Sequence, residues 1–120
     1  MADREVQAAF AEGGTVMTFH NADVAGDKFV YAADVCIIVR NNHTAAQTVT
    51  VNVPPGSASV KDRTKGTLAK QNIVLSVPAS GQAVIPPLPA IFRNSSDLNK
   101  VSLTYSAVTA LSVAFVKVKP

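Results

Sequence analysis

Apolar and polar side chains alternate in the C-terminal part of the chain, in the stretch KVSLTYSAVTALSVAFVKV at residues 100–118. A period of two is typical of a β-strand with one buried face. One unbroken strand of this length would span roughly 60 Å, whereas a compact domain of 120 residues is only about 35 Å across. The sequence therefore predicts a turn within 106–110 and a β-hairpin that pairs Val101–Tyr105 with Leu111–Val118.

The same alternation recurs upstream in short runs, which are separated by Gly, Pro, Asn and Asp. The predicted strands are residues 16–20, 28–32, 34–40, 47–53, 73–77 and 82–85. The run 34–40 is apolar at nearly every position, which predicts a strand buried on both faces in mid-sheet. About eight short strands with turn residues between them predict an all-β fold, a single antiparallel β-sandwich of the immunoglobulin-like or jelly-roll-like kind.

The apolar phase of the last predicted strand shifts after Phe115, to Val116 and Val118. A β-bulge would produce this shift, and so would a final strand that is buried on both faces. The pattern by itself is compatible with both.

Two segments lie outside the alternating pattern. Residues 3–12, DREVQAAFAE, have apolar positions at helical spacing and are followed by two glycines, so they predict a short helix or an extended arm. Residues 56–71 hold little apolar content and predict a long exposed loop. The expected organisation is an N-terminal arm or short helix over 1–14 and a β-sandwich domain over 15–120.

The charge content of the chain is low. Charged residues make up 16% of it, against about 25% in typical soluble domains. A lightly charged surface suits a protein that contacts a neighbour, although a plain small-residue sandwich would have the same composition. The net charge is +3, and the 56–71 loop carries Lys61, Arg63, Lys65 and Lys70. Such a loop can attract an acidic protein face or can be simply solvated; because no aromatics interleave these cations, direct nucleic-acid binding is not expected.

Catalytic and metal-binding patterns are weak in this sequence. Cys36, the single cysteine, lies among apolar β-formers and predicts a small buried residue. His20 has Asp23 and Asp27 nearby, but these aspartates fall in a glycine-containing turn, where Asp is common for backbone reasons. No nucleophile elbow, phosphate-binding loop or dinucleotide fingerprint is found. We expect a non-enzyme with no catalytic residues, no cofactor and no metal site, and no apolar stretch is long enough to predict a membrane span.

Glycan binding is the main alternative function for a small β-sandwich. Sugar faces are usually held by exposed aromatic rings, which are scarce here. Four aromatics fall in strand phases that predict core positions: Phe19, Phe29, Tyr105 and Phe115. Three are free to be surface anchors: Phe10, Tyr31 and Phe92. Three candidates are too few for a convincing sugar-binding platform, so an adhesion module that binds glycans stays the alternative function.

The order of segments resembles the small β-sandwich head decoration and minor capsid proteins of tailed bacteriophages. Three stretches carry the resemblance: DKFVYAADVCIIVRNN followed by QTVTVNVP, VLSVPASGQAVIPPLP leading into IFRN, and KVSLTYSAVTALSVAFVKV. Together they cover roughly residues 15–118. The chain adds an N-terminal segment over 1–14 and a longer basic loop.

This resemblance implies a structural virion protein that is made in the bacterial cytoplasm and binds the capsid surface. Its partner would be the major capsid protein, and it would form a homo-oligomer, with a trimer favoured. Binding only the assembled lattice would stabilise that lattice by mass action. The expected contact residues lie in the two segments outside the sandwich pattern: Arg4, Phe10, Lys61, Arg63 and Lys65.

Overall fold

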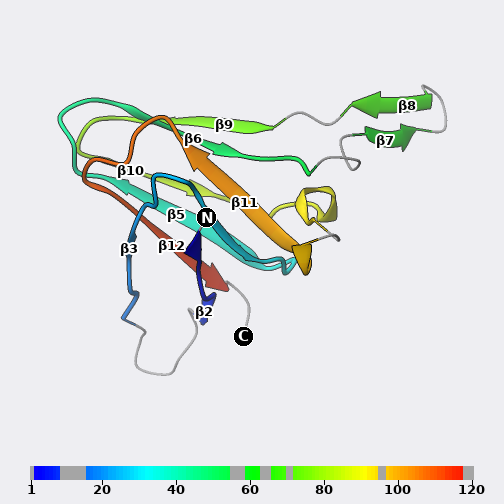
Figure 1. Cartoon of the computed structure of the whole chain (residues 1–120), viewed down its shortest axis with the longest axis horizontal. Helices are drawn as coiled ribbons and strands as arrows, with labels where there is room; N and C mark the ends of the chain where they lie inside the picture. The colour runs from blue at the N-terminus through cyan, green and yellow to red at the C-terminus, as the bar shows by residue number, and fades with distance from the viewer. Residues whose placement is uncertain are drawn as a thin grey trace.

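In a computed structural model, the chain forms two sheets that pack face to face as a β-sandwich (Figure 1). The structure describes residues 2–8, 16–54, 59–62, 66–69, 72–94 and 97–117. The all-β class and the sandwich architecture that the strand pattern predicts are confirmed.

Each of the two main sheets joins strands from distant parts of the chain. The first has the order β1-β4-β11-β6-β9, formed by Ala2–Asp3, Asp27–Val30, Lys100–Tyr105, Gln47–Val51 and Ile73–Val77. The second has the order β10-β5-β12-β2, formed by Gly81–Ile85, Val35–Asn41, Leu111–Lys117 and Gln7–Ala8. Strand β3 (His20–Asn21) also pairs with β12, and a short 3₁₀ helix, η1 (Ala90–Phe92), precedes β11. Pairing is antiparallel throughout both sheets except for β1 and β2, which run parallel to β4 and β12.

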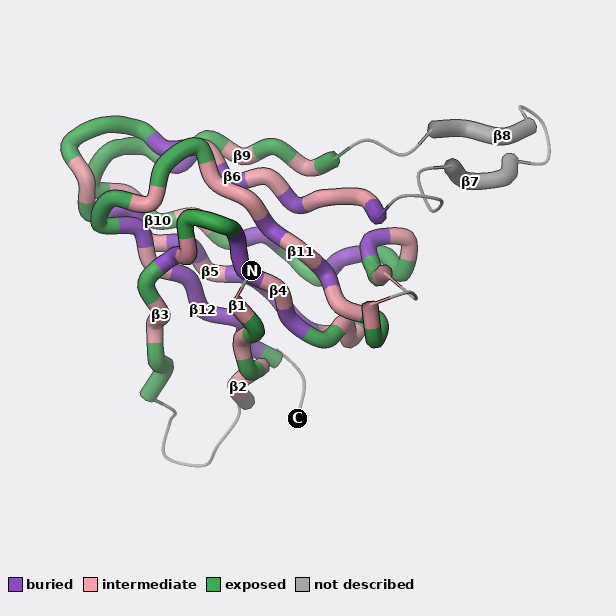
Figure 2. Tube along the Cα trace, in the orientation of Figure 1, coloured by how far each residue is buried: buried purple, intermediate pink, exposed green. Residues whose placement is uncertain are grey.

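The core lies between the sheets and is built from the inward phase of the alternating strands. The rings of Phe29 (β4) and Phe115 (β12) stack across it, with their centroids 4.7 Å apart. Val49 and Val51 of β6 are fully buried, and Figure 2 shows that the buried positions follow the central strands. Because each such side chain contributes about 1.5–3 kcal/mol on burial, this alternation is the main source of stability.

The two central strands of the second sheet, β5 and β12, are buried on both faces. On their outer face, Cys36, Ala114 and Val116 form a second apolar cluster, against which Phe19 and Ile38 pack. The register between β5 and β12 is unbroken from Leu111 to Lys117. The phase shift after Phe115 therefore reflects a strand buried on both faces, not a bulge. Cys36 is buried as expected, and this burial raises the pKa of its thiol.

The predicted C-terminal hairpin is wrong in its pairing, although the turn and both strands lie where they were expected. Strand β11 pairs with β4 and β6, whereas β12 pairs with β5 in the other sheet. The connection crosses from one sheet to the other, and Ser106 holds its start by donating its backbone N–H to Thr48 O at 2.9 Å. Both inner faces of a sandwich are apolar, so alternation fits an arch between sheets as well as a hairpin within one.

The N-terminal segment is an extended arm over 2–8, not a helix. Its strands β1 and β2 form backbone hydrogen bonds in parallel pairing with β4 and β12. A helix of this length would be only marginally stable on its own, so the strand pairing is favoured. The first predicted strand, 16–20, is also shorter than expected. Within the described residues 16–21, only His20–Asn21 pair in a sheet, and Phe19 packs on the outer cluster.

The predicted loop over 56–71 contains two strands, which corrects the expectation of irregular structure. Strands β7 (Ser59–Asp62) and β8 (Gly66–Ala69) form an antiparallel hairpin. This hairpin is a separate two-stranded sheet and pairs with no strand of the other two (Figure 1). Its strands read SVKD and GTLA, which are too short to show an apolar alternation in the sequence.

Candidate functional site

The N-terminal arm runs along one side of the sandwich and contacts both sheets. Strand β1 pairs with β4, and Arg4 continues the contact by donating its backbone N–H to Lys28 O at 2.8 Å. Strand β2 pairs with β12 at Val116 and Lys117. The Gln7 side chain donates to Thr18 O at 2.6 Å and accepts from Thr18 N at 2.7 Å. The described part of the arm is therefore a structural element of the fold.

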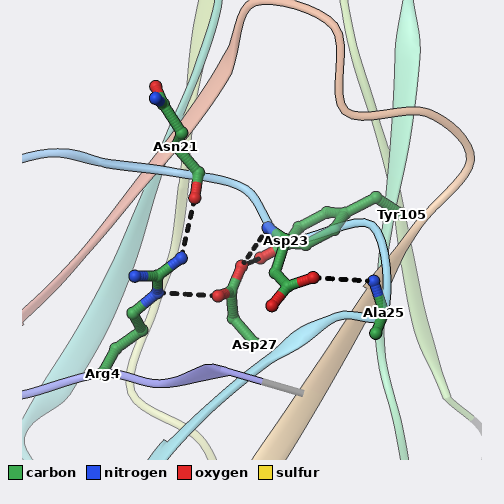
Figure 3. A network of polar contacts seen from close by, with 6 residues as sticks. All are labelled: Arg4, Asn21, Asp23, Ala25, Asp27 and Tyr105. Carbon is green, nitrogen blue, oxygen red and sulfur yellow. Dashed lines mark hydrogen bonds and ion pairs between the residues drawn. The ribbon is translucent and has the colours of Figure 1, made fainter.

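A buried carboxylate fixes the arm in place (Figure 3). Asp27 is fully buried, and its Oδ1 accepts a hydrogen bond from Arg4 Nε at 2.7 Å. Its Oδ2 accepts from the Tyr105 hydroxyl at 2.6 Å and from Asp23 N at 3.2 Å. A buried carboxylate is tolerated only when a cation and further donors satisfy it, and here Arg4 supplies the cation. The guanidinium also donates to Asn21 O at 2.8 Å.

The electrostatics of this network act on Tyr105. Burial of the phenol raises the pKa of Tyr105, and the hydrogen bond to the Asp27 carboxylate raises this pKa further. An ionised Tyr105 would place a second negative charge beside Asp27. The arrangement therefore keeps Tyr105 protonated as a donor and does not prepare it as a base.

The turn interpretation of the aspartates holds for Asp23. Its Oδ1 accepts from Ala25 N at 3.0 Å, and its backbone O accepts from Gly26 N at 2.8 Å. Asp27 has a different role, because it begins β4 in the same inward phase as the buried Phe29. That phase was the available signal that Asp27 would be buried and in need of a cation.

Two further ion pairs link the arm and β4 to the segment around β11. Lys100 Nζ lies 2.8 Å from Asp3 Oδ1, and Lys28 Nζ lies 3.0 Å from Asp97 Oδ2. The hydrogen bond from Lys100 lowers the pKa of Asp3, and the hydrogen bond to Asp97 raises the pKa of Lys28. Because these pairs are solvent-accessible, each contributes little to stability.

The structure describes two of the five sequence-predicted contact residues, Arg4 and Lys61. Arg4 is held against Asp27 in the interior side of the arm. Lys61 lies in β7 of the separate hairpin. Phe10, Arg63 and Lys65 lie outside the described residues.

The aromatic residues are more buried than the sequence predicts. Phe92 is fully buried, so the expectation that it is free to be a surface anchor is wrong; its place in η1 turns the ring into the core. Tyr31 is partly buried, and its hydroxyl donates to Leu88 O at 2.9 Å. Among the described residues, no aromatic side chain is exposed.

Two surface depressions lie at different sites on the sandwich. A polar cleft of about 240 Å³ is lined by side chains that can hydrogen-bond a ligand, with one proline and one valine: Asn52, Val53, Pro54, Asn94, Asp97, Lys100 and Ser102. An apolar groove of about 380 Å³ lies between the outer strands β9 and β10 and is continued by residues 86–89, PPLP. No charged residue lines this groove.

Comparisons with known proteins found no relationship from which a function could be transferred. No protein-family model matches the chain. A search of curated proteins found no match, and a search of solved structures found none either. In the described ranges, no cluster of three or more His, Cys, Asp or Glu side chains is placed to hold a metal ion, and no helix is long and apolar enough to cross a membrane.

Proposed function

We propose that this protein is a structural virion component that binds the assembled capsid lattice of a tailed bacteriophage and stabilises it. The observation that carries the proposal is the hairpin β7–β8, which is built outside both sheets of a self-contained sandwich. Its first strand contains Lys61, and Arg63 and Lys65 follow in the chain. A hairpin with basic residues, attached to a β-sandwich, suits a protein that binds an acidic surface of its partner.

The role of the sandwich body is to carry the hairpin. Several of its described polar side chains form hydrogen bonds within the fold. Arg4 and Tyr105 donate to the Asp27 carboxylate, and Asn41 donates to the backbone oxygen of Val77. A structural role, not a catalytic one, agrees with this use of polar groups. Several copies on one lattice would reinforce each other, because each weak contact raises the effective concentration of the next.

Charge reversal of the hairpin tests the proposal. The triple variant Lys61→Glu, Arg63→Glu, Lys65→Glu should lose co-sedimentation with heads assembled from the capsid protein encoded near it. A control with the same change in charge is Arg93→Glu, Lys117→Glu, Lys119→Glu, which leaves the hairpin intact and should still bind. Wild-type protein should also raise the melting temperature of the heads. Failure of the wild type to co-sediment, or equal binding by both triple variants, would contradict the proposal.

Glycan binding is the second candidate function, and the polar cleft favours it. Asn52 and Ser102 offer an amide and a hydroxyl beside Asp97, a set that can hydrogen-bond sugar hydroxyls. Stacking would have to come from outside the described residues, because no described aromatic is exposed. Binding of the isolated protein to host cells, abolished by Ser102→Tyr in the cleft and unaffected by the hairpin triple variant, would favour this candidate over capsid binding.

A further inference from the structure

The two sides of the sandwich differ in how their sheet edges are protected. On one side the arm pairs with both sheets, β1 on β4 and β2 on β12, and β3 adds to β12. On the other side β9 and β10 are the outermost strands, and no described strand pairs with their outer edges. An uncovered edge offers unpaired backbone groups to another strand.

The register identifies which backbone groups of β9 are free. In an antiparallel sheet, successive residues direct their N–H and C=O to opposite sides. Thr48 O accepts from Ser106 N in the direction of β11, so the neighbouring Val49 directs its groups to β9, where it pairs with Leu75. Leu75 is therefore bonded within the sheet. Val74 and Ser76, on either side of it, direct their backbone groups outward.

The side chains of β9 carry none of the features that usually block edge pairing. The strand reads IVLSV, with no charge, proline or glycine. Val74 is 66% exposed on the outer face, and Leu75 is only partly buried although it points toward the core side. Leu75 borders the apolar groove, whose opposite wall is formed by residues such as Ile85 and Leu88. A strand added beside β9 would cover this open end of the core.

We propose that β9 pairs with β9 of a second copy of this chain, antiparallel about a two-fold axis at Leu75. In this register Val74 faces Ser76 of the other copy, and the outward backbone groups of both residues are satisfied. On the inward face, Leu75 then meets Leu75 of the other copy above the two grooves, and Ile73 faces Val77 of the other copy. The strand is thus complementary to itself, as a two-fold interface requires.

Charge does not oppose a second copy as the partner. Each chain carries a net charge of +3, which disfavours most contacts between copies. The edge strand and the groove are lined only by uncharged residues, so pairing there brings no like charges together. Strand β10 is less suited to such pairing, because its inward positions Gly81 and Ala83 offer little apolar surface. The two-fold contact depends on this geometry alone and is separate from the capsid function and from the trimer that the resemblance implies.

Disulfide trapping tests both the contact and its register, in a Cys36→Ala background. Opposed residues of a non-hydrogen-bonded antiparallel pair lie about 4.5 Å apart at Cα, which is within the range of about 4.4–6.8 Å that a disulfide accepts. Leu75→Cys should therefore form a covalent dimer under mild oxidation. Val74→Cys and Ser76→Cys should each stay monomeric alone, because their own counterparts are diagonal neighbours at about 7–8 Å.

A mixture of Val74→Cys and Ser76→Cys proteins should give a heterodimer. Both positions are exposed, so the mixing experiment still tests the register even if Leu75→Cys fails to fold. Without cross-linking, sedimentation should show a wild-type dimer that dissociates on dilution, as expected for a small interface. Val74→Lys should be monomeric under the same conditions. A wild type that is monomeric at all concentrations, with no trapping in the mixture, would overturn the proposal. So would a monomer whose binding to heads is lost on Val74→Lys, because the edge would then receive a strand of the capsid protein.

Discussion

The hydroxyl of Tyr105 donates a hydrogen bond of 2.6 Å to Oδ2 of Asp27, and the two side chains come from neighbouring strands of one sheet. Asp27 is fully buried, and on its other oxygen it meets Arg4 from the N-terminal arm. One carboxylate thus connects the arm, β4 and β11. The network explains why the arm can lie ordered against the sandwich although its two strands are only two residues long each.

Alkaline pH should weaken the fold through Tyr105. Its folded-state pKa is raised, so the stabilisation is complete below the unfolded pKa of about 10 and is lost as pH rises above it. While only the unfolded state is ionised, the free energy of unfolding should fall by about 1.4 kcal/mol per pH unit from this residue. Tyr105→Phe should remove this slope and lower stability at neutral pH by about 1.5–3 kcal/mol. Urea unfolding of both proteins between pH 8 and 11 measures the difference.

Removal of the Arg4 cation should lower the free energy of unfolding more than removal of the Tyr105 hydroxyl. Arg4→Ala leaves Asp27 buried without its ion-pair partner, and we expect a loss of about 3 kcal/mol in unfolding free energy. Arg93→Ala is the matched control, because Arg93 is exposed and should change stability by less than about 0.5 kcal/mol. Equal denaturation midpoints for the two variants would show that the arm does not depend on Asp27.

Asn41 is a second buried polar residue whose removal should destabilise the fold. It is fully buried, and its Nδ2 donates to Ala45 O and Val77 O at 2.9 and 3.1 Å. Asn41→Ala leaves these carbonyls without their donor and should destabilise by about 1–3 kcal/mol. Asn42→Ala removes an exposed side chain of the same type from the next position and should be nearly neutral. Thermal unfolding of the two variants gives the comparison.

The outer cluster should protect Cys36 from thiol reagents. The residue is 7% exposed and its thiol pKa is raised by burial, so labelling in the native state should be slow. Phe19 packs on this cluster, and the Arg40 guanidinium carbon lies 4.0 Å from the centroid of its ring. Phe19→Ala should accelerate labelling about tenfold if it lowers the free energy of local opening by about 1.4 kcal/mol. Val16→Ala, at a side chain that is 94% exposed, should leave the rate unchanged.

Most of the strands could be predicted from the sequence, because each one places its own apolar side chains on one face. Residues 47–51 and 73–77 alternate, and the structure turns their inward phase toward the core. The double-sided burial of β5 also followed from its uninterrupted apolar run. These properties are local, since a side chain in a strand points to a face that its own position decides.

Pairing, by contrast, was decided only by the tertiary structure. The alternation in β11 and β12 is the same whether they pair with each other or lie in opposite sheets, because both inner faces of a sandwich are apolar. The sequence prediction placed Asp27 in a turn, whereas the structure buries it at the start of β4, where the arm brings Arg4 from 23 positions earlier to it. The hairpin β7–β8 left no pattern, because its four-residue strands SVKD and GTLA are too short to show an alternation. Sequence thus determined most of the strands and their inward positions, and the fold determined which side chains meet, since contact depends on chain crossings that no local period records.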